Sequence, residues 1–454
     1  MAPVERLKAI LESVRILPDL PALLGAGERC FLVGGALRDW QLDRVSTDFD
    51  FATPGDPTPL AKLFARRLGG TWFSLDAARC QSRIVAEVEG RRLTYDFAPF
   101  RGTDLDDDLR KRDFTINALA LDLASSLQLH DPLGARQDLR EGMLRCCSAE
   151  VFMDDPLRIL KGARHRASLA FEIEGATFER MKGAAPGLGG IAGERVRGEV
   201  AALFACPPAK RNLSPLGLLH LETSLFGPCG PGGSFEDGVA RVTRCEELID
   251  ALLGKGDRGW LESRLAAEAE EGVSVLTLLK IALFLKGYRP REAAFLSDAL
   301  RLSRRSRAAL VSLAGLSDDR WGEIAALASR ERSRALWVDS LGRESIAAAA
   351  FLAALANGAP GELAGTLFPL LESFRTHEVG GRVPDLLNGA WLRERLKIGE
   401  GPHIGILLEK VRREEMLGRI RSRGDAEKFL ISLVQKRIDK ASGRSYNRPG
   451  NERE

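Results

Sequence analysis

The chain has 454 residues and an almost balanced charge, with 66 lysines and arginines against 63 aspartates and glutamates. Single hydrophobic cores seldom grow beyond about 250–300 residues, so this length predicts several domains, about two to four. The net charge of +3 excludes a strongly acidic or strongly basic protein. Whether a nucleic acid can bind therefore depends on how the charge is distributed.

Cysteine and apolar patterns exclude other classes of protein. The 7 cysteines form no Cys-x-x-Cys pair and the 5 histidines are far apart, so neither a disulfide framework nor a zinc site is predicted. The charged N-terminal segment lacks an apolar signal core, and no apolar run approaches the ~20 residues needed to span a bilayer. We therefore expect a soluble cytoplasmic protein with no membrane partner.

An apolar run of strand length, 30–33, leads into Gly34 and Gly35. Because glycine has no side chain, the backbone at this point can approach a ligand such as phosphate closely. The next segment, 36–42, has helical character and carries Arg38. Amides at its start can therefore face an anion beside a cation.

A second strand-like segment carries Asp48 and Asp50. Side chains two apart on a strand point to one face, so the two carboxylates converge on the same small volume. Such acids repel each other unless a hard cation lies between them, and Mg²⁺ bound by one or two carboxylates plus substrate phosphates is the common arrangement. The pair predicts a site for nucleotidyl transfer. The alternative is a turn followed by a solvated acidic strand end.

The following segments have helical spacing over 60–68 and strand character over 71–75, 83–88 and 92–97. Glu89 and Gly90 are typical of a hairpin between the last two strands. Together these elements predict a small mixed α/β head. Asp96, in the last strand, can supply a third carboxylate beside the first two, or it can be an ordinary strand-end acid.

The stretch 106–123 favours a helix that places Asp113 and Asn117 on one face, with Arg112 flanking them. This mixture of donors and acceptors suits a ribose and its neighbouring phosphate. Taken alone, the stretch is more typical of a charged helix start.

A further helix is predicted within 154–173, with Pro156 at its start. Arg158, Lys161 and Arg164 recur every third residue and so lie along one side, while apolar residues between them supply a packing face. We interpret this segment as a packed helix whose charges are aimed at a ligand. The alternative is a basic stripe on a surface helix.

The rest of the chain favours helices without strands, which suits a helical array. The expected helices lie around 238–254, 260–271, 274–286, 291–313, 320–337, 342–356 and 361–375. From 382 to 454 the sequence has 17 basic and 11 acidic residues. This local surplus can attract a phosphate backbone, although a solvated helical surface explains it equally well.

The order of the motifs resembles a known family. Gly-Gly-x-x-Arg-Asp, then Asp-x-Asp on a strand, then Arg-Asp-Phe-Thr-x-Asn-Ala resembles the polymerase-beta-like nucleotidyltransferases, in the form found in class II tRNA nucleotidyltransferases and bacterial poly(A) polymerases. The resemblance is dense over 31–200 and visible again over 386–430. It departs at Lys111 and Lys161, where the family usually has arginine, and at His165, where it usually has phenylalanine.

The resemblance implies an α/β (α+β) polymerase-beta-like nucleotidyltransferase head followed by all-helical neck, body and tail domains. We place the catalytic head at 1–150, the base-recognising neck at 151–215, the body at 216–380 and the tRNA-binding tail at 381–440. The polar end, 441–454, is expected to be disordered.

The implied reaction is the template-independent attack of an RNA 3′-hydroxyl on the α-phosphorus of a nucleoside triphosphate, with release of pyrophosphate. Two Mg²⁺ on Asp48 and Asp50 would activate the hydroxyl and stabilise the leaving oxygen. By the same resemblance the RNA is tRNA and the product is its CCA end, made from CTP and ATP. The residues expected to bind the nucleotide are Gly34, Gly35, Arg38, Arg112, Asp113, Asn117, Asp155, Arg158, Lys161 and Arg164.

The resemblance makes Asp155 and Arg158 the base-reading pair. Cytosine and adenine each present an amine donor beside a ring-nitrogen acceptor, which a carboxylate and a guanidinium complement. Uracil and guanine present the opposite pattern and would leave buried polar groups unpaired.

Other products and another class of protein stay open. Poly(A) polymerases and enzymes that add only part of CCA share these motifs, so the sequence does not separate them. A catalytically silent RNA-binding protein with the same fold would be favoured only if an acid of the Asp-x-Asp pair or the glycine pair were missing, and all are present.

Overall fold

The protein is described by a computed structural model, which divides into two compact units. One contains Met1–Gly230 and Phe295–Leu302, and the other contains Pro231–Ala294 and Ser303–Glu454. The residues that the structure describes are 3–124, 127–219, 221, 225, 234–256, 258–286, 290–314, 358–379, 386–396, 401–416, 419–420 and 422–441.

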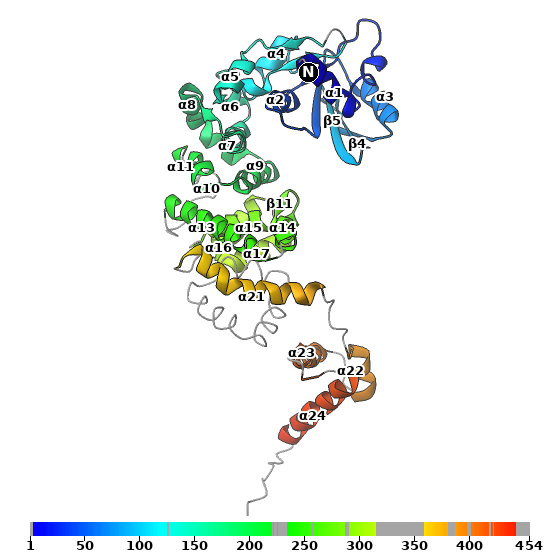
Figure 1. Ribbon diagram of the computed structural model, residues 1–454, viewed down its shortest axis with the longest axis vertical. Coiled ribbons are helices and arrows are strands. Elements are labelled where there is room, and N and C mark those ends of the chain that lie inside the picture. Colours follow the sequence, from blue (N-terminus) through cyan, green and yellow to red (C-terminus); the bar gives the residue numbers. More distant parts are fainter. Residues whose placement is uncertain are drawn as a thin grey trace, which may run out of the picture. The chain divides into compact units, whose positions relative to one another are not determined.

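A seven-stranded mixed sheet forms the head of the first unit (Figure 1). Its strands are β1 (Phe31–Val33), β2 (Asp48–Thr53), β3 (Thr71–Asp76), β4 (Gln81–Val88), β5 (Arg91–Pro99), β6 (Ala120–Asp122) and β7 (Leu129–His130). Their order is β3-β4-β5-β2-β1-β6-β7. Strands β2 and β5 run parallel, whereas the other neighbouring pairs are antiparallel. The expected mixed α/β head is confirmed.

One face of this sheet is closed by aromatic packing. Phe49 stacks on Tyr95 with ring centroids 5.6 Å apart, and Phe51 stacks on Phe97 at 4.6 Å. Phe64, from helix α3 (Thr58–Leu68), meets both rings of β5 edge-on. Each such buried side chain stabilises the fold by roughly 1.5–3 kcal/mol. Since strand side chains alternate, the residues between these aromatics point to the opposite, open face.

The two-residue turn between β4 and β5 is the expected hairpin. Glu89 and Gly90 have φ of 50° and 74°, as a turn with two left-handed residues requires. Helix α1 (Pro3–Ser13) precedes the sheet, and the hydroxyl of Tyr95 donates to the carbonyl oxygen of Val14 at 2.7 Å.

The helix expected within 106–123 ends earlier than predicted. Helix α4 spans Leu105–Arg110, the short 3-10 turn η2 (Thr115–Asn117) follows it, and 120–122 form the strand β6. The chain is extended at Phe114, with φ −124° and ψ 148°, because this residue forms a β-bridge with Cys146. That bridge pulls the backbone out of the helix.

Short helices follow the head within the same unit. They are α5 (Ala135–Glu141), α6 (Val151–Asp154), α7 (Leu157–Leu169), α8 (Gly175–Ala184), η3 (Ala185–Gly190), α9 (Gly193–Ala205), α10 (Ala209–Asn212) and α11 (Ser214–Leu218), whereas α2 (Gly35–Gln41) lies between β1 and β2 in the chain. The expectation of an all-helical neck is wrong in one detail, because β9 (Glu172–Ile173) pairs in parallel with β8 (Met143–Leu144). Ala170 ends α7 in the left-handed region, φ 60°, and this allows the chain to turn toward β8.

The described residues beyond 231 are mainly helical. The elements are α13 (Phe235–Leu253), α14 (Arg258–Ala266), β10 (Glu268–Glu270), β11 (Val273–Ser274), α15 (Val275–Phe284), α16 (Pro290–Ala299), α17 (Arg304–Ala314) and α21 (Pro360–Val379). The helices expected around 320–337 and 342–356 lie outside the described residues.

Two expectations for this region are wrong. The helix expected over 260–271 stops at Ala266, because Gly272, with φ 70°, turns the polar segment after it into the β10-β11 hairpin. The single helix expected over 291–313 is two helices, since Arg301 between them has φ 53°.

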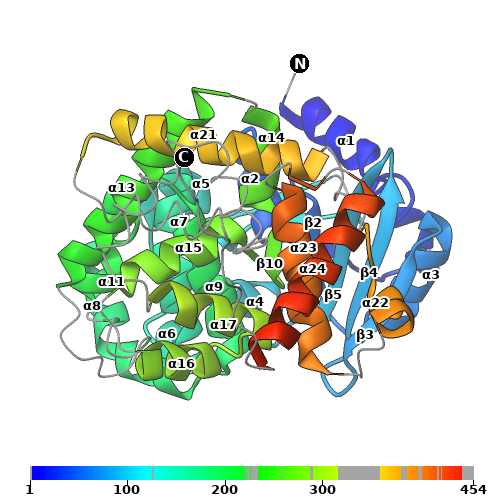
Figure 2. The same cartoon turned by 90° about the horizontal axis from the view of Figure 1, so that it is seen from below.

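The last described helices are α22 (Gly389–Leu396), α23 (Pro402–Met416) and α24 (Arg423–Ala441), drawn in orange to red in Figure 2. They share a small core made of Leu387, Leu392, Leu407, Val411, Ile420, Ala426 and Leu430. The segment 442–454, most of the part expected to be disordered, lies outside the described residues. Within the described part of the chain, every helix is too short or too polar to cross a bilayer.

Candidate active site

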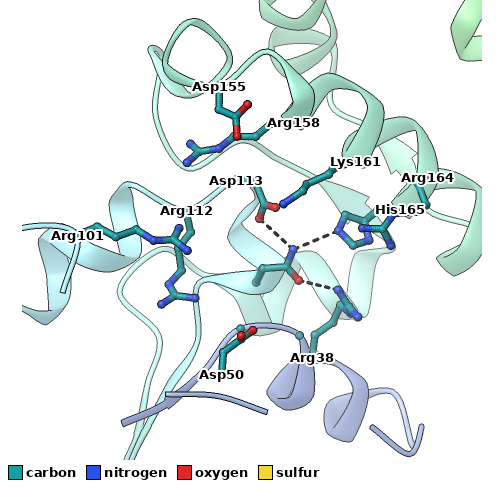
Figure 3. Close-up of a pocket in the computed structure, with 13 residues that line it drawn as sticks. Arg38, Asp50, Arg101, Arg112, Asp113, Asp155, Arg158, Lys161, Arg164 and His165 are labelled. Atoms are coloured by element: carbon teal, nitrogen blue, oxygen red, sulfur yellow. Dashed lines mark hydrogen bonds between the residues drawn. The ribbon is translucent and has the colours of Figure 1, made fainter. Parts of the chain in front are cut away.

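A pocket of about 340 Å³ opens in the first unit, and Figure 3 shows its lining. The sequence predicts eleven of its thirteen lining residues. The residues are Gly34, Gly35, Arg38, Asp50, Arg101, Arg112, Asp113, Asn117, Asp155, Arg158, Lys161, Arg164 and His165. Residues from the head motifs and from α7, far apart in sequence, therefore share one cavity.

Cations outnumber carboxylates in this lining. Six arginine and lysine side chains face three aspartates. A concave site with an excess of one sign of charge concentrates ligands of the opposite sign. The pocket is therefore suited to an anion with several charges, such as a triphosphate.

Asp48 and Asp50 lie on the open face of β2, opposite the buried Phe49 and Phe51, as the alternation predicts. Solvent reaches Asp50, yet burial by the surrounding walls raises the pKa of its carboxyl above the usual 3.8. The charge of Arg112 opposes this shift, while the neighbouring Asp48 adds to it. Asp48 does not line the pocket itself and is exposed beside it.

Asp96 is the residue for which the sequence leaves two interpretations. It lies next to Asp50 in register, on the parallel strand β5. Its carboxylate pairs with Arg83 through both oxygens, at 2.8 and 2.6 Å. The structure thus engages Asp96 elsewhere, and among the described residues no cluster of three or more histidine, cysteine or acidic side chains is placed to hold a metal.

The remaining acid pair fits Mg²⁺. Its donors are hard carboxylate oxygens, and the raised pKa of Asp50 reflects, besides its burial, negative charge from Asp48 and Asp96. Mg²⁺ commonly takes one or two carboxylates and completes its octahedron with water and substrate phosphates. Asp48 and Asp50 satisfy that pattern.

Gly34 brings the backbone close to the acid pair. Its φ is 81°, and a Cβ placed there would lie 3.1 Å from Asp50 Oδ2 and 3.4 Å from a guanidinium nitrogen of Arg112. Both the left-handed backbone and the lack of space require glycine. The following residue, Gly35, begins α2 next to the guanidinium of Arg38.

A hydrogen-bond network fixes Asn117 at the centre of the pocket. Arg38 Nη1 donates to Asn117 Oδ1 at 2.8 Å, and Asn117 Nδ2 donates to Asp113 Oδ1 at 3.0 Å. Arg38 is held in turn by Asp39, at 2.9 Å. Asp113 and Asn117 therefore meet as predicted, although through a 3-10 turn instead of one face of a helix.

The same amide nitrogen lies 3.3 Å from Nε2 of His165 (Figure 3). His165 is buried, 4% exposed, and meets the ring of Phe114 edge-on at 6.0 Å. Burial, reinforced by the nearby charges of Arg164, Arg38 and Lys161, lowers the pKa of His165 to about 3. The imidazole is neutral at physiological pH.

Asp113 has the opposite character. Burial by itself would raise the pKa of this carboxyl, but the charge of Lys161 and hydrogen bonds from Asn117 and the Phe114 amide hold it below its usual value. Its Oδ1 accepts both of those hydrogen bonds. Asp113 is therefore an ionised acceptor in the wall of the pocket.

Helix α7 delivers its three cations to the pocket, which confirms that they share one side. Arg164 donates to Glu199 of α9 at 2.7 Å, and Arg158 donates to the carbonyl oxygen of Val151 at 3.3 Å. Asp155 lies before the helix, in an extended conformation, and accepts from Arg195 at 2.8 Å. Neighbouring helices thus orient these side chains.

Arg101 and His165 line the pocket although the sequence does not single them out as ligands. The backbone N–H of Arg101 donates to Asp108 Oδ1 at 3.0 Å, and Asp108 Oδ2 also holds Arg112. Burial and the nearby Arg112 lower the pKa of Arg101. No carboxylate of the described chain pairs with its guanidinium, so it can accept an anion. Its place in an irregular loop offers no periodicity by which to find it.

The fold and the site together define a nucleotidyltransferase of the polymerase-beta-like class, because an acid pair on an open sheet face adjoins a glycine turn and a cation-lined pocket. Residues 30–145 match the family model described as the poly A polymerase head domain. The CC-adding tRNA nucleotidyltransferase of Geobacter sulfurreducens is 33% identical over 91% of this chain and 94% of its own length. The chain belongs to the tRNA nucleotidyltransferase and poly(A) polymerase family.

Two further relatives show how the likeness is distributed. The A-adding tRNA nucleotidyltransferase of Deinococcus radiodurans is 42% identical, over 42% of this chain and 44% of its own length. The Thermotoga maritima CCA-adding enzyme, solved as a complex with tRNA, has a TM-score of 0.64 and 24% identity over 94% of this chain and 98% of that one. The latter likeness supports the fold.

Proposed function

We propose that this protein adds CCA, or part of it, to the 3′ end of tRNA from CTP and ATP, in the cytoplasm. The RNA 3′-hydroxyl attacks the α-phosphorus, the bond from that phosphorus to the bridging oxygen breaks, and pyrophosphate leaves. One observation carries the proposal: Asp50 of β2, Asp155 and six cations, Arg158 among them, line a single pocket. One relative that matches most of this chain and one that matches less than half of it are both named tRNA nucleotidyltransferases, which supports tRNA as the acceptor.

Asp48 and Asp50 are the residues that would hold Mg²⁺. When bound, Mg²⁺ supplies positive charge that stabilises the developing negative charge on phosphate oxygens and favours an ionised attacking hydroxyl. The exposed position of Asp48, outside the pocket lining, leaves room for the incoming RNA end beside it.

Phosphate binding falls to the glycine turn and the cations. Gly34 has no side chain to keep a phosphate away from the backbone beside Asp50, and Arg38, Lys161 and Arg164 supply charge along the pocket wall. Arg112 is held by Asp108, at 2.8 and 3.0 Å, and so keeps one orientation. A preorganised guanidinium loses little freedom when it binds phosphate oxygens.

The ribose is bound by acceptors. The carboxylate of Asp113 is ionised, so both of its oxygens are acceptors. Its Oδ1 already accepts hydrogen bonds from Asn117 and from the Phe114 amide. Its Oδ2 has no hydrogen-bond partner among the described residues, so a ribose hydroxyl can donate to it.

The test of the function is direct. We would incubate the protein with tRNA transcripts that end before CCA, after the first C, or after CC, with each labelled triphosphate supplied alone and then together. Product lengths would be measured at single-nucleotide resolution. Growth by C alone, by A alone on CC ends, or by all three nucleotides identifies the partial or complete activity.

Two outcomes would contradict the proposal. Long A tails on any RNA would make the protein a poly(A) polymerase, an activity that the matched head-domain description also names. No incorporation, together with intact tRNA binding, would favour a silent RNA-binding protein. Asp48→Ala and Asp50→Ala serve as controls, since each should abolish incorporation while tRNA still binds.

Arg101 extends the proposed phosphate site. Arg101→Ala should raise KM roughly tenfold, because a charge-assisted hydrogen bond to phosphate is lost. An effect on KM for CTP places Arg101 on the triphosphate, and an effect on KM for tRNA places it on the RNA backbone. Arg110→Ala is the matched control, since Arg110 is exposed at the end of α4 and does not line the pocket. Equal KM values in both variants would remove Arg101 from the site.

A further inference from the structure

We propose that His165 is a positioning residue that locks Asn117 and Asp113 into the arrangement that selects ribonucleotides over 2′-deoxyribonucleotides. This inference rests on the proposed function, in which the two residues contact the ribose. His165 stands where the related motif usually has phenylalanine, so the usual motif does not supply the contact between this side chain and Asn117.

The orientation of the Asn117 amide follows from its partners. Arg38 Nη1 can only donate, so the atom 2.8 Å from it must be the amide oxygen. The amide nitrogen therefore faces both Asp113 Oδ1, at 3.0 Å, and His165 Nε2, at 3.3 Å. An amide nitrogen does not accept hydrogen bonds, so Nε2 must be the acceptor and the imidazole must be neutral, with its proton on Nδ1.

The number of available atoms then decides what a substrate can meet. Both N–H groups of Asn117 are used, one by Asp113 and one by His165. Oδ1 of Asp113 is used as well, by Asn117 and by the Phe114 amide. Asp113 and Asn117 therefore offer the pocket only acceptors, namely Oδ2 of Asp113 and the second lone pair of Asn117 Oδ1. A ribose hydroxyl can donate to them, whereas a 2′-deoxyribose leaves an acceptor unpaired.

A phenylalanine at this position would keep the packing and remove the hydrogen bond to Asn117. Its ring can meet Phe114 edge-on, as the imidazole does at 6.0 Å. It offers no acceptor, so one N–H of Asn117 would lose its partner inside the protein. The amide could then rotate toward water or substrate, and the contacts to Arg38 and Asp113 would loosen.

The experiment compares H165F and H165Q with the wild type, using CTP and 2′-dCTP, then ATP and 2′-dATP. H165F should lower kcat/KM for the ribonucleotides roughly tenfold, mainly through KM, and change the values for the deoxynucleotides less. The ratio of kcat/KM for the ribonucleotide to kcat/KM for the deoxynucleotide, here called the sugar ratio, therefore falls. H165Q places an amide oxygen near the position of Nε2, so it should restore most of the wild-type ratio.

A matched control comes from a second histidine that, in the described part of the chain, lies edge-on to a phenylalanine. His130 meets Phe31 with centroids 6.0 Å apart, but its Nε2 has no hydrogen-bond partner within the described chain. H130F makes the same substitution without breaking a hydrogen bond at Nε2, and it should leave the sugar ratio unchanged. Thermal unfolding reports folding of every variant; if H165F is unfolded, H165L replaces it as the variant without an acceptor.

N117A separates the two levels of the argument. If N117A narrows the sugar ratio while H165F keeps the wild-type ratio, the inference about His165 is wrong and the ribose site stands. If N117A itself keeps the wild-type ratio, the assignment of the ribose fails and takes this inference with it. Failure of the proposed reaction would appear earlier, as absence of any incorporation.

Discussion

Two side chains are expected to govern the choice of base. Asp155 and Arg158 line the pocket, and Asp155 Oδ2 is held by Arg195 at 2.8 Å. A carboxylate and a guanidinium complement the pairing edges of cytosine and adenine. Asp155→Ala or Arg158→Ala should therefore raise the use of UTP or GTP relative to CTP and ATP, by a factor of roughly 5–150 for a mismatch of about 1–3 kcal/mol.

Competition between labelled triphosphates on one tRNA acceptor measures this discrimination. Asp154→Ala is the control, because Asp154 is the adjacent acid, is exposed and does not line the pocket. It should keep wild-type base choice. If both test variants lose rate and still discriminate as the wild type does, these residues only cap and orient α7.

The free energy of unfolding should depend on pH through the buried His165. Its pKa is about 3 in the folded protein and about 6.5 when unfolded, so below pH 6.5 the unfolded chain binds a proton that the folded chain refuses. Acidification therefore favours unfolding over the window from about 6.5 down to 3. Between pH 7.5 and 5.0 this group should cost the wild type about 2 kcal/mol.

Urea unfolding of the wild type and H165F at the two pH values tests the point. H165F lacks the titrating group, so its free energy of unfolding should fall by about 2 kcal/mol less than that of the wild type. Asp113 does not confuse the comparison, because its lowered pKa matters only below its usual 3.8. Equal losses in both proteins would mean that the folded protein accepts the proton on His165.

What the sequence could and could not predict differs from residue to residue. Asp50 and Arg158 are found because strand and helix periods fix which face they occupy, and Gly34 is found because a glycine pair follows a strand-like run. Arg101 lies in an irregular loop, where no period applies. The role of His165 depends on a hydrogen bond to a residue 48 positions away, which only the folded backbone brings together.

Helix α7 packs closely against the head because Gly162 has no side chain. A Cβ on Gly162 would lie 2.7 Å from the ring of the fully buried Phe114 and 3.0 Å from Met181. Alanine at this position gains about 1 kcal/mol of helix propensity but pushes the helix from the head. Gly162→Ala should therefore destabilise the protein by roughly 1–3 kcal/mol and raise KM for nucleotide, since the cations of α7 shift.

Gly198→Ala is the matched substitution in the neighbouring helix α9. Gly198 is exposed and a Cβ there meets nothing within 4 Å, so this variant should gain stability by about 1 kcal/mol. Unfolding midpoints and KM are measured for both proteins. If both variants change the free energy of unfolding by the same amount and in the same direction, the packing of Gly162 against Phe114 does not determine how α7 contacts the head.

At the level of elements, strand and helix existence follows from the sequence better than their ends do. Strands β1 to β5 and helix α7 are located by their patterns, whereas β6 and β7 are not. The helix expected through Asp113 fails because a long-range bridge between Phe114 and Cys146 draws the backbone out, and the β10-β11 hairpin is missed because it depends on Gly272 at φ 70°. Local propensity cannot report either cause.

RNA affinity is a property of the whole molecule, because the pocket lies in the first unit and the basic C-terminal segment belongs to the second. The surplus of 17 basic over 11 acidic residues in 382–454 predicts binding to the phosphate backbone with little sequence readout. A chain ending at Val379 should therefore bind tRNA more weakly and with a shallower salt dependence, while CTP binding is unchanged.

A full-length variant tests the same idea without removing the small core of the last helices. Arg395, Lys410 and Lys428 are exposed, and changing all three to Gln removes charge and leaves Leu392, Leu407 and Leu430 in place. Each cation that contacts a phosphate releases about one counterion, so the slope of log K against log salt should fall by up to roughly 3. Filter binding at several salt concentrations measures this slope, with CTP affinity as the internal control. An unchanged slope in both the truncated and the substituted protein would show that these cations only solvate the surface, and that the pocket and its surroundings hold the RNA by themselves.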